Sequence, residues 1–188
     1  MTPVGILLAA GRGRRFDPTG SRNKLLQRLP GGELVVAASA RNLLSILPRV
    51  IAVVPPDDGG VADALRALGC EVTVCPDADS GMAASLVHAI GHSLPADAWL
   101  VALGDMPFVL PQTIRALCDA LTGGAAIAAP VMQGRRGNPV GFGTPHLPAL
   151  LALQGDQGAR AILKSQPVTE VTVDDPGIFR DIDTSADL

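Results

Sequence analysis

The chain has 188 residues, of which 47% are hydrophobic and 18% charged, and its formal net charge is -3. This length predicts one domain over residues 1–188 that buries roughly 70% of the unfolded surface, and the apolar content excludes a disordered chain. Charged, Gly or Pro residues interrupt every apolar run before the roughly 18 residues of a membrane span, and no membrane or nucleic-acid partner is expected of this mildly acidic sequence.

Short apolar runs alternate with longer stretches of helical apolar spacing as far as Pro130. Runs that are apolar on both faces are typical of strands buried in a parallel sheet. The predicted strands are Val4–Ala10, Val50–Val54, Val72–Val74, Trp99–Leu103 and Ala125–Val131, and the predicted helices are Glu33–Leu47, Val61–Leu68, Met82–Ser93 and Gln112–Leu121. Right-handed crossovers between such units predict an α/β fold, a Rossmann-like three-layer α/β/α sandwich with a mostly parallel sheet and a binding face at the carboxyl ends of the strands.

After Pro130 the alternation becomes less regular. We expect a loop and a short strand within Met132–Phe142, helices at Leu147–Leu153 and Ala159–Lys164, a strand at Val168–Val173 and a closing extended segment at Phe179–Thr184. No internal repeat or second domain is indicated.

The first strand leads into a loop rich in glycine and arginine. Residues Leu8–Phe16 read LAAGRGRRF, and six of the fifteen basic residues lie between Arg12 and Arg28. Glycines let a backbone approach an anion, and arginines and Lys24 supply charge-assisted hydrogen bonds. The loop is therefore predicted to bind a nucleoside triphosphate, with a solvated loop as the alternative. Neither the dinucleotide-binding motif nor the P-loop fits, because Phe16 replaces the third glycine and Leu25 follows Lys24.

Two acidic motifs predict a site for Mg²⁺. Asp105 follows the strand Trp99–Leu103, where a carboxylate can hold a metal that bridges substrate phosphates. The alternative is that Asp105 caps the helix beginning near Pro111. Asp181 and Asp183 alternate along an extended segment and therefore share one face, where a divalent metal would offset their repulsion. A solvated edge is the alternative for this second pair.

The segment Ser80–Ser85 reads SGMAAS and enters a predicted helix, where free N–H groups and hydroxyls can bind a base or a ribose. An ordinary helix cap is the alternative. His88 and His92 have a zinc-compatible spacing in that helix, but no HExxH motif supports a zinc site.

The three cysteines are odd in number and form no CxxC motif, so a disulfide framework is not expected. A reducing cytoplasm fits this usage best. Cys118 lies in a predicted helix of apolar spacing and is expected to fill the core.

Taken together, these motifs resemble the molybdenum cofactor cytidylyltransferase family, nucleotidyltransferases related to the molybdopterin-guanine dinucleotide synthases. The segments LAAGRGRRF with Lys24, SGMAASL, LGDMPFV, RGNPVGF, GDQGAR and DIDTSADL occur in the family's order and span essentially the whole chain. The resemblance implies a nucleotide-diphospho-sugar transferase fold and an Mg²⁺-dependent transfer of CMP from CTP to the terminal phosphate of molybdopterin, with release of pyrophosphate. Such a transfer depends on positioning and charge neutralisation, so no covalent enzyme intermediate is expected.

The resemblance also implies roles for individual residues. Catalytic roles are implied for Lys24, Arg14 and Asp105, and metal binding for Asp105 and Asp183, with Asp181 as the alternative second ligand. The implied nucleotide-binding residues are Leu8, Ala9, Ala10, Gly11, Arg12, Gly13, Arg15, Lys24, Ser80, Gly81 and Ser85. The implied acceptor-binding residues are Arg135, Gly137, Asn138, Pro139, Asp156 and Gln157.

The chain departs from the family pattern in three places. The loop from Phe16 to Lys24 is longer than usual, Asn138 stands where histidine is frequent, and Ser185-Ala186 replaces a proline-acidic pair. In that family an alanine at the position of Ala10 accompanies CTP and a glycine accompanies GTP, so Ala10 favours CTP.

Three alternatives stay open for the function. They are guanylyl transfer from GTP to the same cofactor, nucleotidyl transfer to another phosphorylated acceptor, and a non-catalytic carrier that hands molybdopterin to a client molybdoenzyme. The presence of Lys24, Asp105 and Asp183 argues against the carrier, which would not need them.

Overall fold

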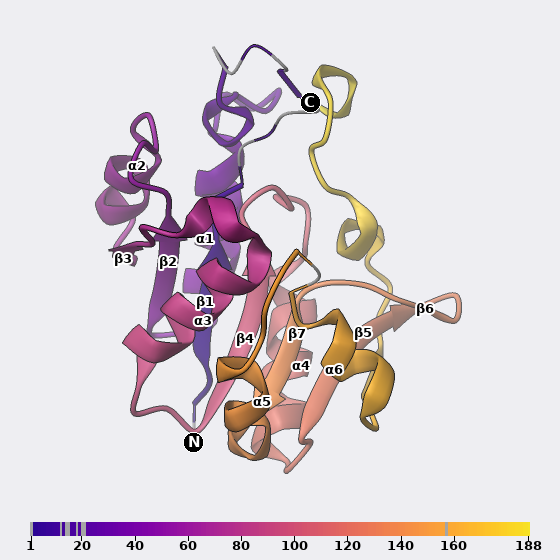
Figure 1. The fold of residues 1–188 in the computed structure, drawn as a ribbon. Coiled ribbons are helices and arrows are strands. Elements are labelled where there is room, and N and C mark those ends of the chain that lie inside the picture. The colour runs from indigo at the N-terminus through magenta and orange to yellow at the C-terminus, as the bar shows by residue number, and fades with distance from the viewer. Residues whose placement is uncertain (1, 12, 14–15, 18, 20–21, 157) are drawn as a thin grey trace.

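The computed structural model describes residues 2–11, 13, 16–17, 19, 22–156 and 158–188. Its centre is an eight-stranded sheet in the order β3-β2-β1-β4-β7-β5-β6, with β8 paired to β5 (Figure 1). The strands are β1 (Val4–Leu8), β2 (Val50–Val54), β3 (Glu71–Val74), β4 (Ala98–Leu103), β5 (Ile127–Met132), β6 (Arg135–Arg136), β7 (Val140–Gly143) and β8 (Thr169–Thr172).

The sheet is mostly parallel, as predicted. Parallel ladders join β1 to β2 and β4, β2 to β3, and β5 to β8. Only β7 and the short β6 run against their neighbours, and β7 lies between β4 and β5, so β4 and β5 point the same way. The carboxyl ends of β1 and β4 therefore meet at one edge, with Leu8 opposite Leu103.

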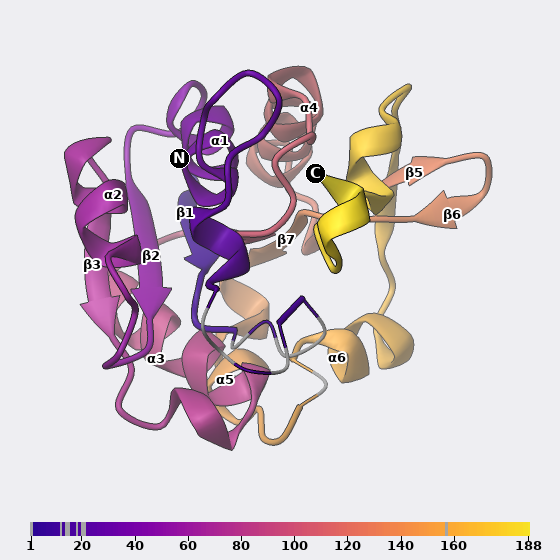
Figure 2. The ribbon, with the colours of Figure 1, turned by 90° about the horizontal axis from the view of Figure 1, so that it is seen from above.

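Helices cover both faces of the sheet and complete the three-layer sandwich (Figure 2). Helices α1 (Val35–Leu44), α2 (Val61–Ala67) and α4 (Pro111–Thr122) contribute to one apolar cluster. Helices α3 (Met82–Ser93), α5 (Leu147–Leu151) and α6 (Arg160–Ser165) contribute to the other cluster. Short 3-10 turns occur at η1 (Lys24–Leu26), η2 (Ala78–Ser80), η3 (Thr144–His146), η4 (Pro176–Phe179) and η5 (Ser185–Asp187).

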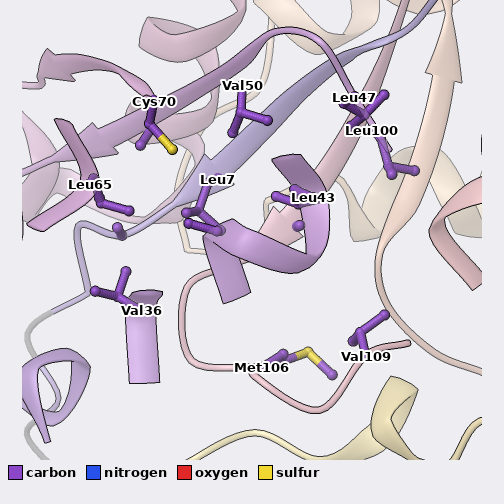
Figure 3. Packing of buried hydrophobic residues seen from close by; sticks show 14 of the residues in the cluster. Leu7, Val36, Leu43, Leu47, Val50, Leu65, Cys70, Leu100, Met106 and Val109 are labelled. Atoms are coloured by element: carbon purple, nitrogen blue, oxygen red, sulfur yellow. The ribbon is translucent and has the colours of Figure 1, made fainter. Parts of the chain in front are cut away.

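The apolar runs of the sequence explain this double core. In β1, Leu7 belongs to the cluster under α1 while Ile6 belongs to the cluster under α3, because successive side chains leave opposite faces. Figure 3 shows Leu7 beside Leu43 of α1 and Val50 of β2. Both Leu7 and Ile6 are fully buried, which accounts for the lack of polar alternation in this strand.

Most predicted elements form, but several boundaries differ. The strand predicted at Val50–Val54 and the helix predicted at Met82–Ser93 have the predicted bounds. The first strand ends at Leu8 rather than Ala10, where the chain turns away into the loop. The segment predicted as extended at Phe179–Thr184 pairs with no strand among the described residues.

The last residues of the chain return across the carboxyl edge of the sheet and are fixed there by buried hydrogen bonds. The Asp175 carboxylate, 1% exposed, accepts from the Leu110 amide at 2.9 Å and the Thr113 hydroxyl at 2.6 Å, both at the start of α4. The Ile182 amide donates to the Asp105 carbonyl at 2.8 Å. The alternative that Asp105 caps α4 is wrong, because Asp175 holds that position.

Within the part of the chain that the structure describes, no helix is long and apolar enough to cross a membrane.

Candidate active site

A cavity of about 490 Å³ opens where β1 and β4 end. One side is formed by the loop after β1 and by Asp105, and the other by the start of α3. The lining residues are Leu8, Ala10, Gly11, Gly13, Lys24, Leu25, Ala78, Asp79, Gly81, Met82, Ser85, Leu103, Asp105 and Asp156. The cavity therefore lies at the edge of the sheet where the alternation of strands and helices predicts a binding face.

The loop after β1 is anchored to its neighbours before it reaches the cavity. The Ala9 amide donates to the Val53 carbonyl at 3.0 Å, and the Gly104 amide donates to the Leu8 carbonyl at 2.9 Å. Gly13 has φ +58, and a Cβ built on it would lie 3.2 Å from Cγ of Lys24. Glycine thus allows the loop to turn tightly against the lysine. Arg12, Arg14 and Arg15, three of the predicted site residues, lie outside the described residues.

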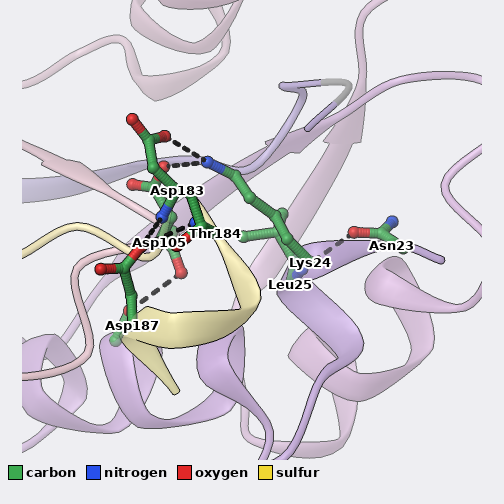
Figure 4. A network of polar contacts seen from close by, with 9 residues as sticks. Asn23, Lys24, Leu25, Asp105, Asp183, Thr184 and Asp187 are labelled. Atoms are coloured by element: carbon green, nitrogen blue, oxygen red, sulfur yellow. Dashed lines mark hydrogen bonds and ion pairs between the residues drawn. The ribbon is translucent and has the colours of Figure 1, made fainter. Parts of the chain in front are cut away.

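Lys24 joins two carboxylates from distant parts of the chain (Figure 4). Its Nζ lies 2.6 Å from Oδ2 of Asp105 and 3.5 Å from Oδ1 of Asp183. The lysine side chain is only 11% exposed, so water screens these contacts less than on an open surface. The side chain of Asn23 accepts from the Leu25 amide at 3.0 Å and fixes the start of η1, which carries the lysine.

Three carboxylates gather beside this lysine. Ligand oxygens of Asp105, Asp181 and Asp183 all lie within 4.8 Å of one another. Carboxylate oxygens are the ligands that Mg²⁺ and Mn²⁺ prefer, and three negative charges at this spacing favour a divalent cation. The chemistry of the donor set therefore fits the predicted metal. Asp181, the alternative second ligand, lies in the same group as Asp183.

The turn that follows Asp183 is closed by Asp187. The Asp187 Oδ2 accepts from the Asp183 amide at 3.1 Å, the Thr184 amide at 2.6 Å and the Thr184 hydroxyl at 2.9 Å. The hydrogen bonds from Thr184, followed by that from Asp183, hold the pKa of the Asp187 carboxyl below its ordinary value. Such bonds are expected to favour the ionised form of Asp187.

On the opposite side of the cavity, the backbone at the start of α3 packs closely against the Gly155 loop. Gly81 has φ +121, and a Cβ on it would lie 2.6 Å from the Gly155 carbonyl and 2.5 Å from Oδ1 of Asp156. The Ala83 amide donates to that same carbonyl at 3.1 Å. Gly81 and Ser85 line the cavity, whereas Ser80 is exposed and lies outside the lining. Asp156, predicted to bind the acceptor, lines the same cavity as the loop after β1.

The other predicted acceptor residues lie apart from this lining. The Arg135 guanidinium stacks over the Phe179 ring at 4.6 Å, and Gly137 packs against Ile178, which would overlap a Cβ there. Asn138 and Pro139 line a separate cavity of about 10 Å³ beneath the end of β4, too small for a cofactor. Gln157 lies outside the described residues.

Several lining residues were not predicted from the sequence, namely Leu25, Ala78, Asp79, Met82 and Leu103. Every one of these five residues lies within two positions of a predicted site residue. Leu103 is also the last residue of a predicted strand. The signal that could have found Met82 is its place in the motif SGMAAS. As a large exposed apolar side chain, 45% accessible, it forms an apolar surface at the cavity.

The cysteines and histidines take no part in the cavity lining. Burial raises the pKa of the Cys70 and Cys118 thiols to about 11, so neither is a nucleophile near neutral pH. Cys118 is a core residue, as predicted. The His88 ring bonds with the Thr73 hydroxyl at 2.8 Å, and His92 bonds with the His88 carbonyl. Among the described residues, the carboxylate trio is the one group of three or more metal-ligating side chains.

Comparison with known proteins identifies relatives along nearly the whole chain. The sequence profile described as "MobA-like NTP transferase domain" matches residues 5–171. The purine catabolism protein PucB of Bacillus subtilis (strain 168) is 27% identical over 197 residues, a match covering 96% of this chain and 91% of PucB.

Solved structures share the fold and, in one case, contain a metal. Rv0371c from Mycobacterium tuberculosis H37Rv is 28% identical with a TM-score of 0.86, covering 100% of this chain and 95% of that one. A complex of Rv0371c with manganese gives 27% identity and a TM-score of 0.82, covering 100% and 96%. Molybdopterin-guanine dinucleotide biosynthesis protein A from Archaeoglobus fulgidus, 20% identical with a TM-score of 0.69 over 98% and 94%, has the same fold.

Proposed function

The chain belongs to the family of MobA-like NTP transferase domains, and we propose that it transfers CMP from CTP to the terminal phosphate of a molybdopterin-type cofactor. The observation that carries this proposal is the contact of Lys24 with Asp105 and Asp183, where Lys24 and Asp105 line a cavity of about 490 Å³. A buried cation beside a carboxylate group is suited to hold phosphates. Membership of this family supports a nucleotidyltransferase. The choice of CTP as nucleotide and of molybdopterin as acceptor is what we propose.

The reaction brings together two negatively charged groups, the acceptor phosphate and the triphosphate of CTP. An oxygen of the acceptor phosphate forms a bond to the α-phosphorus of CTP, and the bond from that phosphorus to the bridging oxygen breaks, which releases pyrophosphate. Lys24 is placed to neutralise charge on the α-phosphate, and Ala10, Gly11 and Gly13 line the same cavity. Positioning in this way provides much of the acceleration in phosphoryl-type transfers, and no protein nucleophile is required.

Mg²⁺ is the metal we propose for this site. Asp105 and Asp183 would hold it, and Asp181 is close enough to share in binding, since all three oxygens lie within 4.8 Å of one another. When bound, the ion supplies positive charge that stabilises the transferring phosphate and the leaving pyrophosphate. The manganese complex of Rv0371c supports a divalent cation in this family.

CTP is the proposed nucleotide because of Ala10. Its side chain is 8% exposed and belongs to the cavity lining, so a methyl group at this position takes up space beside the nucleotide. The resemblance to the cytidylyltransferases associates alanine here with CTP. The free, buried cysteines are compatible with a reducing cytoplasm, where we propose the activity occurs.

A molybdopterin-type acceptor is supported by the motif order of the sequence and by the fold shared with the Archaeoglobus fulgidus protein, whose name places it in molybdopterin-guanine dinucleotide biosynthesis. The position of Asp156 in the cavity supports an approach of the acceptor along the Gly155 loop. Delivery of the product to a molybdoenzyme would follow from this acceptor.

The test is pyrophosphate release from the purified protein with Mg²⁺ and molybdopterin-type cofactor, comparing CTP, GTP, ATP and UTP. Release that requires both CTP and the cofactor is expected. A preference for GTP would instead assign guanylyl transfer. Nucleotide binding without release in a folded sample would exclude this acceptor, and a second series with other phosphorylated acceptors would separate a different transferase from a carrier.

A further inference from the structure

We propose that Asp187 is a positioning residue for the metal site: its carboxylate fixes the backbone of Asp183 and thereby the placement of the Asp183 side chain. This inference rests on the proposed metal-dependent transfer, in which Asp183 is a ligand.

Three hydrogen bonds converge on one oxygen of the Asp187 carboxylate. Oδ2 of Asp187 accepts from the amides of Asp183 and Thr184 at 3.1 and 2.6 Å and from the Thr184 hydroxyl at 2.9 Å. Figure 4 shows Asp187 facing back toward Thr184 and Asp183. Hydrogen bonds to an ionised acceptor are roughly twice as strong as neutral ones, so this carboxylate holds the turn closed.

The backbone around Asp183 is held from both directions along the chain. On the N-terminal side, the Ile182 amide donates to the Asp105 carbonyl at 2.8 Å, and the Ile182 side chain is fully buried. On the C-terminal side, Asp187 binds the amide of Asp183 itself. With both ends fixed, the Asp183 carboxylate comes within 3.5 Å of the Lys24 Nζ.

Asp187 is not itself one of the carboxylates that could hold the metal. Asp105, Asp181 and Asp183 form the group whose oxygens lie within 4.8 Å of one another, and Asp187 is not in it. Residues that orient metal ligands through hydrogen bonds commonly affect metal affinity by about 10- to 100-fold when they are replaced. Asp187 therefore acts on the metal through the backbone of Asp183.

The experiment measures the affinity of the full chain for Mn²⁺ alone by electron paramagnetic resonance, for the wild type, Asp187→Ala, Asp187→Asn and Ser185→Ala. Asp187→Ala should raise the Kd for Mn²⁺ by about tenfold. Asp187→Asn keeps an acceptor oxygen for the same amides and should stay within about threefold of the wild type. Ser185 lies exposed in the same turn and is the matched control, with no expected change.

Turnover provides the second readout. If transfer occurs, Asp187→Ala should raise the Mg²⁺ concentration for half-maximal rate more than it lowers kcat at saturating Mg²⁺, a split that a loss of folded protein would not produce. An unchanged Kd for Mn²⁺ in Asp187→Ala overturns the inference. A loss of Mn²⁺ affinity in Asp187→Asn equal to that in Asp187→Ala also overturns it, because the effect would then come from the charge of Asp187. Absence of Mn²⁺ binding in the wild type would also overturn it.

The two proposals can fail separately. Mn²⁺ binding that depends on Asp187, in a protein that releases no pyrophosphate with any nucleotide, would overturn the proposed reaction and leave the positioning role intact. If the wild type is active and Asp187→Ala is indistinguishable from it in both readouts, the positioning role is overturned and the proposed reaction stands.

Discussion

The two sides of the cavity are built in different ways. One side carries the charged side chains of Lys24 and Asp105, and Asp183 contacts Lys24 from outside the lining; Lys24 meets these two carboxylates from 81 and 159 residues away in the chain. The side at the start of α3 carries Met82 and Ser85 and is held by close backbone packing, where Gly81 lies against Gly155 without room for a Cβ. Under the proposed function, the charged side would stabilise the transition state and the packed side would shape the space for the substrate. Changes on the first should lower kcat, and changes on the second should raise KM or alter selectivity.

The largest effect is expected for Asp105→Asn. This substitution keeps the size of the side chain but removes the charge that lies 2.6 Å from Lys24 and that we propose for the metal. We expect kcat to fall by about 10³-fold, at the upper end of what loss of one electrostatic contact costs. Steady-state pyrophosphate release measures this, with circular dichroism to verify folding. Asp119→Asn, an exposed change on α4, is the control; retained turnover in Asp105→Asn would remove Asp105 from the machinery.

The second prediction distinguishes two roles on the charged side. In Lys24→Met, kcat should fall by about 10²-fold because the α-phosphate loses its cation. The same change should lower the Kd for Mn²⁺ alone by about tenfold, since the ammonium no longer repels the metal or occupies Asp105. Calorimetric titration with Mn²⁺ measures the second effect. Lys164→Met replaces the only other lysine, which is exposed on α6, and should change neither quantity. Weaker Mn²⁺ binding in Lys24→Met would contradict this arrangement.

The sequence could predict some parts of the fold and not others. The parallel half of the sheet was predictable because β1, β2 and β4 are apolar on both faces, which few structures other than a buried parallel strand require. The antiparallel insertion of β7 between β4 and β5 was not, since its four residues carry no signal for a partner. The contacts of Asp175 with α4 were not predictable either: one carboxylate oxygen accepts locally from the Gly177 amide, but the other accepts from residues 62 and 65 positions away.

For the candidate site, the sequence could indicate that neighbouring residues share a face, but not which distant segments meet. Asp181 and Asp183 alternate, so their shared face could be inferred, and the structure brings Asp105 to them. The convergence of Asp156 with Gly81 depends on the return of the Gly155 loop to α3. No pattern within either segment reports that contact, so Asp156 was predicted for the acceptor alone.

The packed side is tested by Gly81→Ala. A Cβ would lie 2.5 Å from Asp156 and 2.6 Å from the Gly155 carbonyl, and a φ of +121 is unfavourable for alanine. The Gly155 loop must shift, so KM for CTP should rise about tenfold while kcat changes about threefold or less. Initial rates over a range of CTP concentrations separate the two constants. Gly91→Ala, within the α3 helix that follows Gly81 and with no atom within 4 Å of a Cβ there apart from neighbouring residues and the helix's own backbone, is the control. A fall in kcat with unchanged KM would mean that this side contributes to the chemical step.

The smallest expected effect concerns base selection by Ala10. Replacing it with glycine removes one methyl from the lining, and one methyl group in a pocket is worth about 1–3 kcal/mol of discrimination. Because the Ala10 side chain is 8% exposed in a cavity of about 490 Å³, a value at the lower limit is expected. The ratio of kcat/KM for CTP to that for GTP should then fall about fivefold in Ala10→Gly. Competition between the two nucleotides in one reaction measures this ratio directly. Ala126→Gly, an exposed change before β5, should leave this ratio unchanged.

The methyl group of Ala10 borders the cavity without bearing charge, so kcat with CTP should stay near the wild-type value in Ala10→Gly. A fall in kcat without a change in the ratio would place Ala10 with the charged side of the cavity.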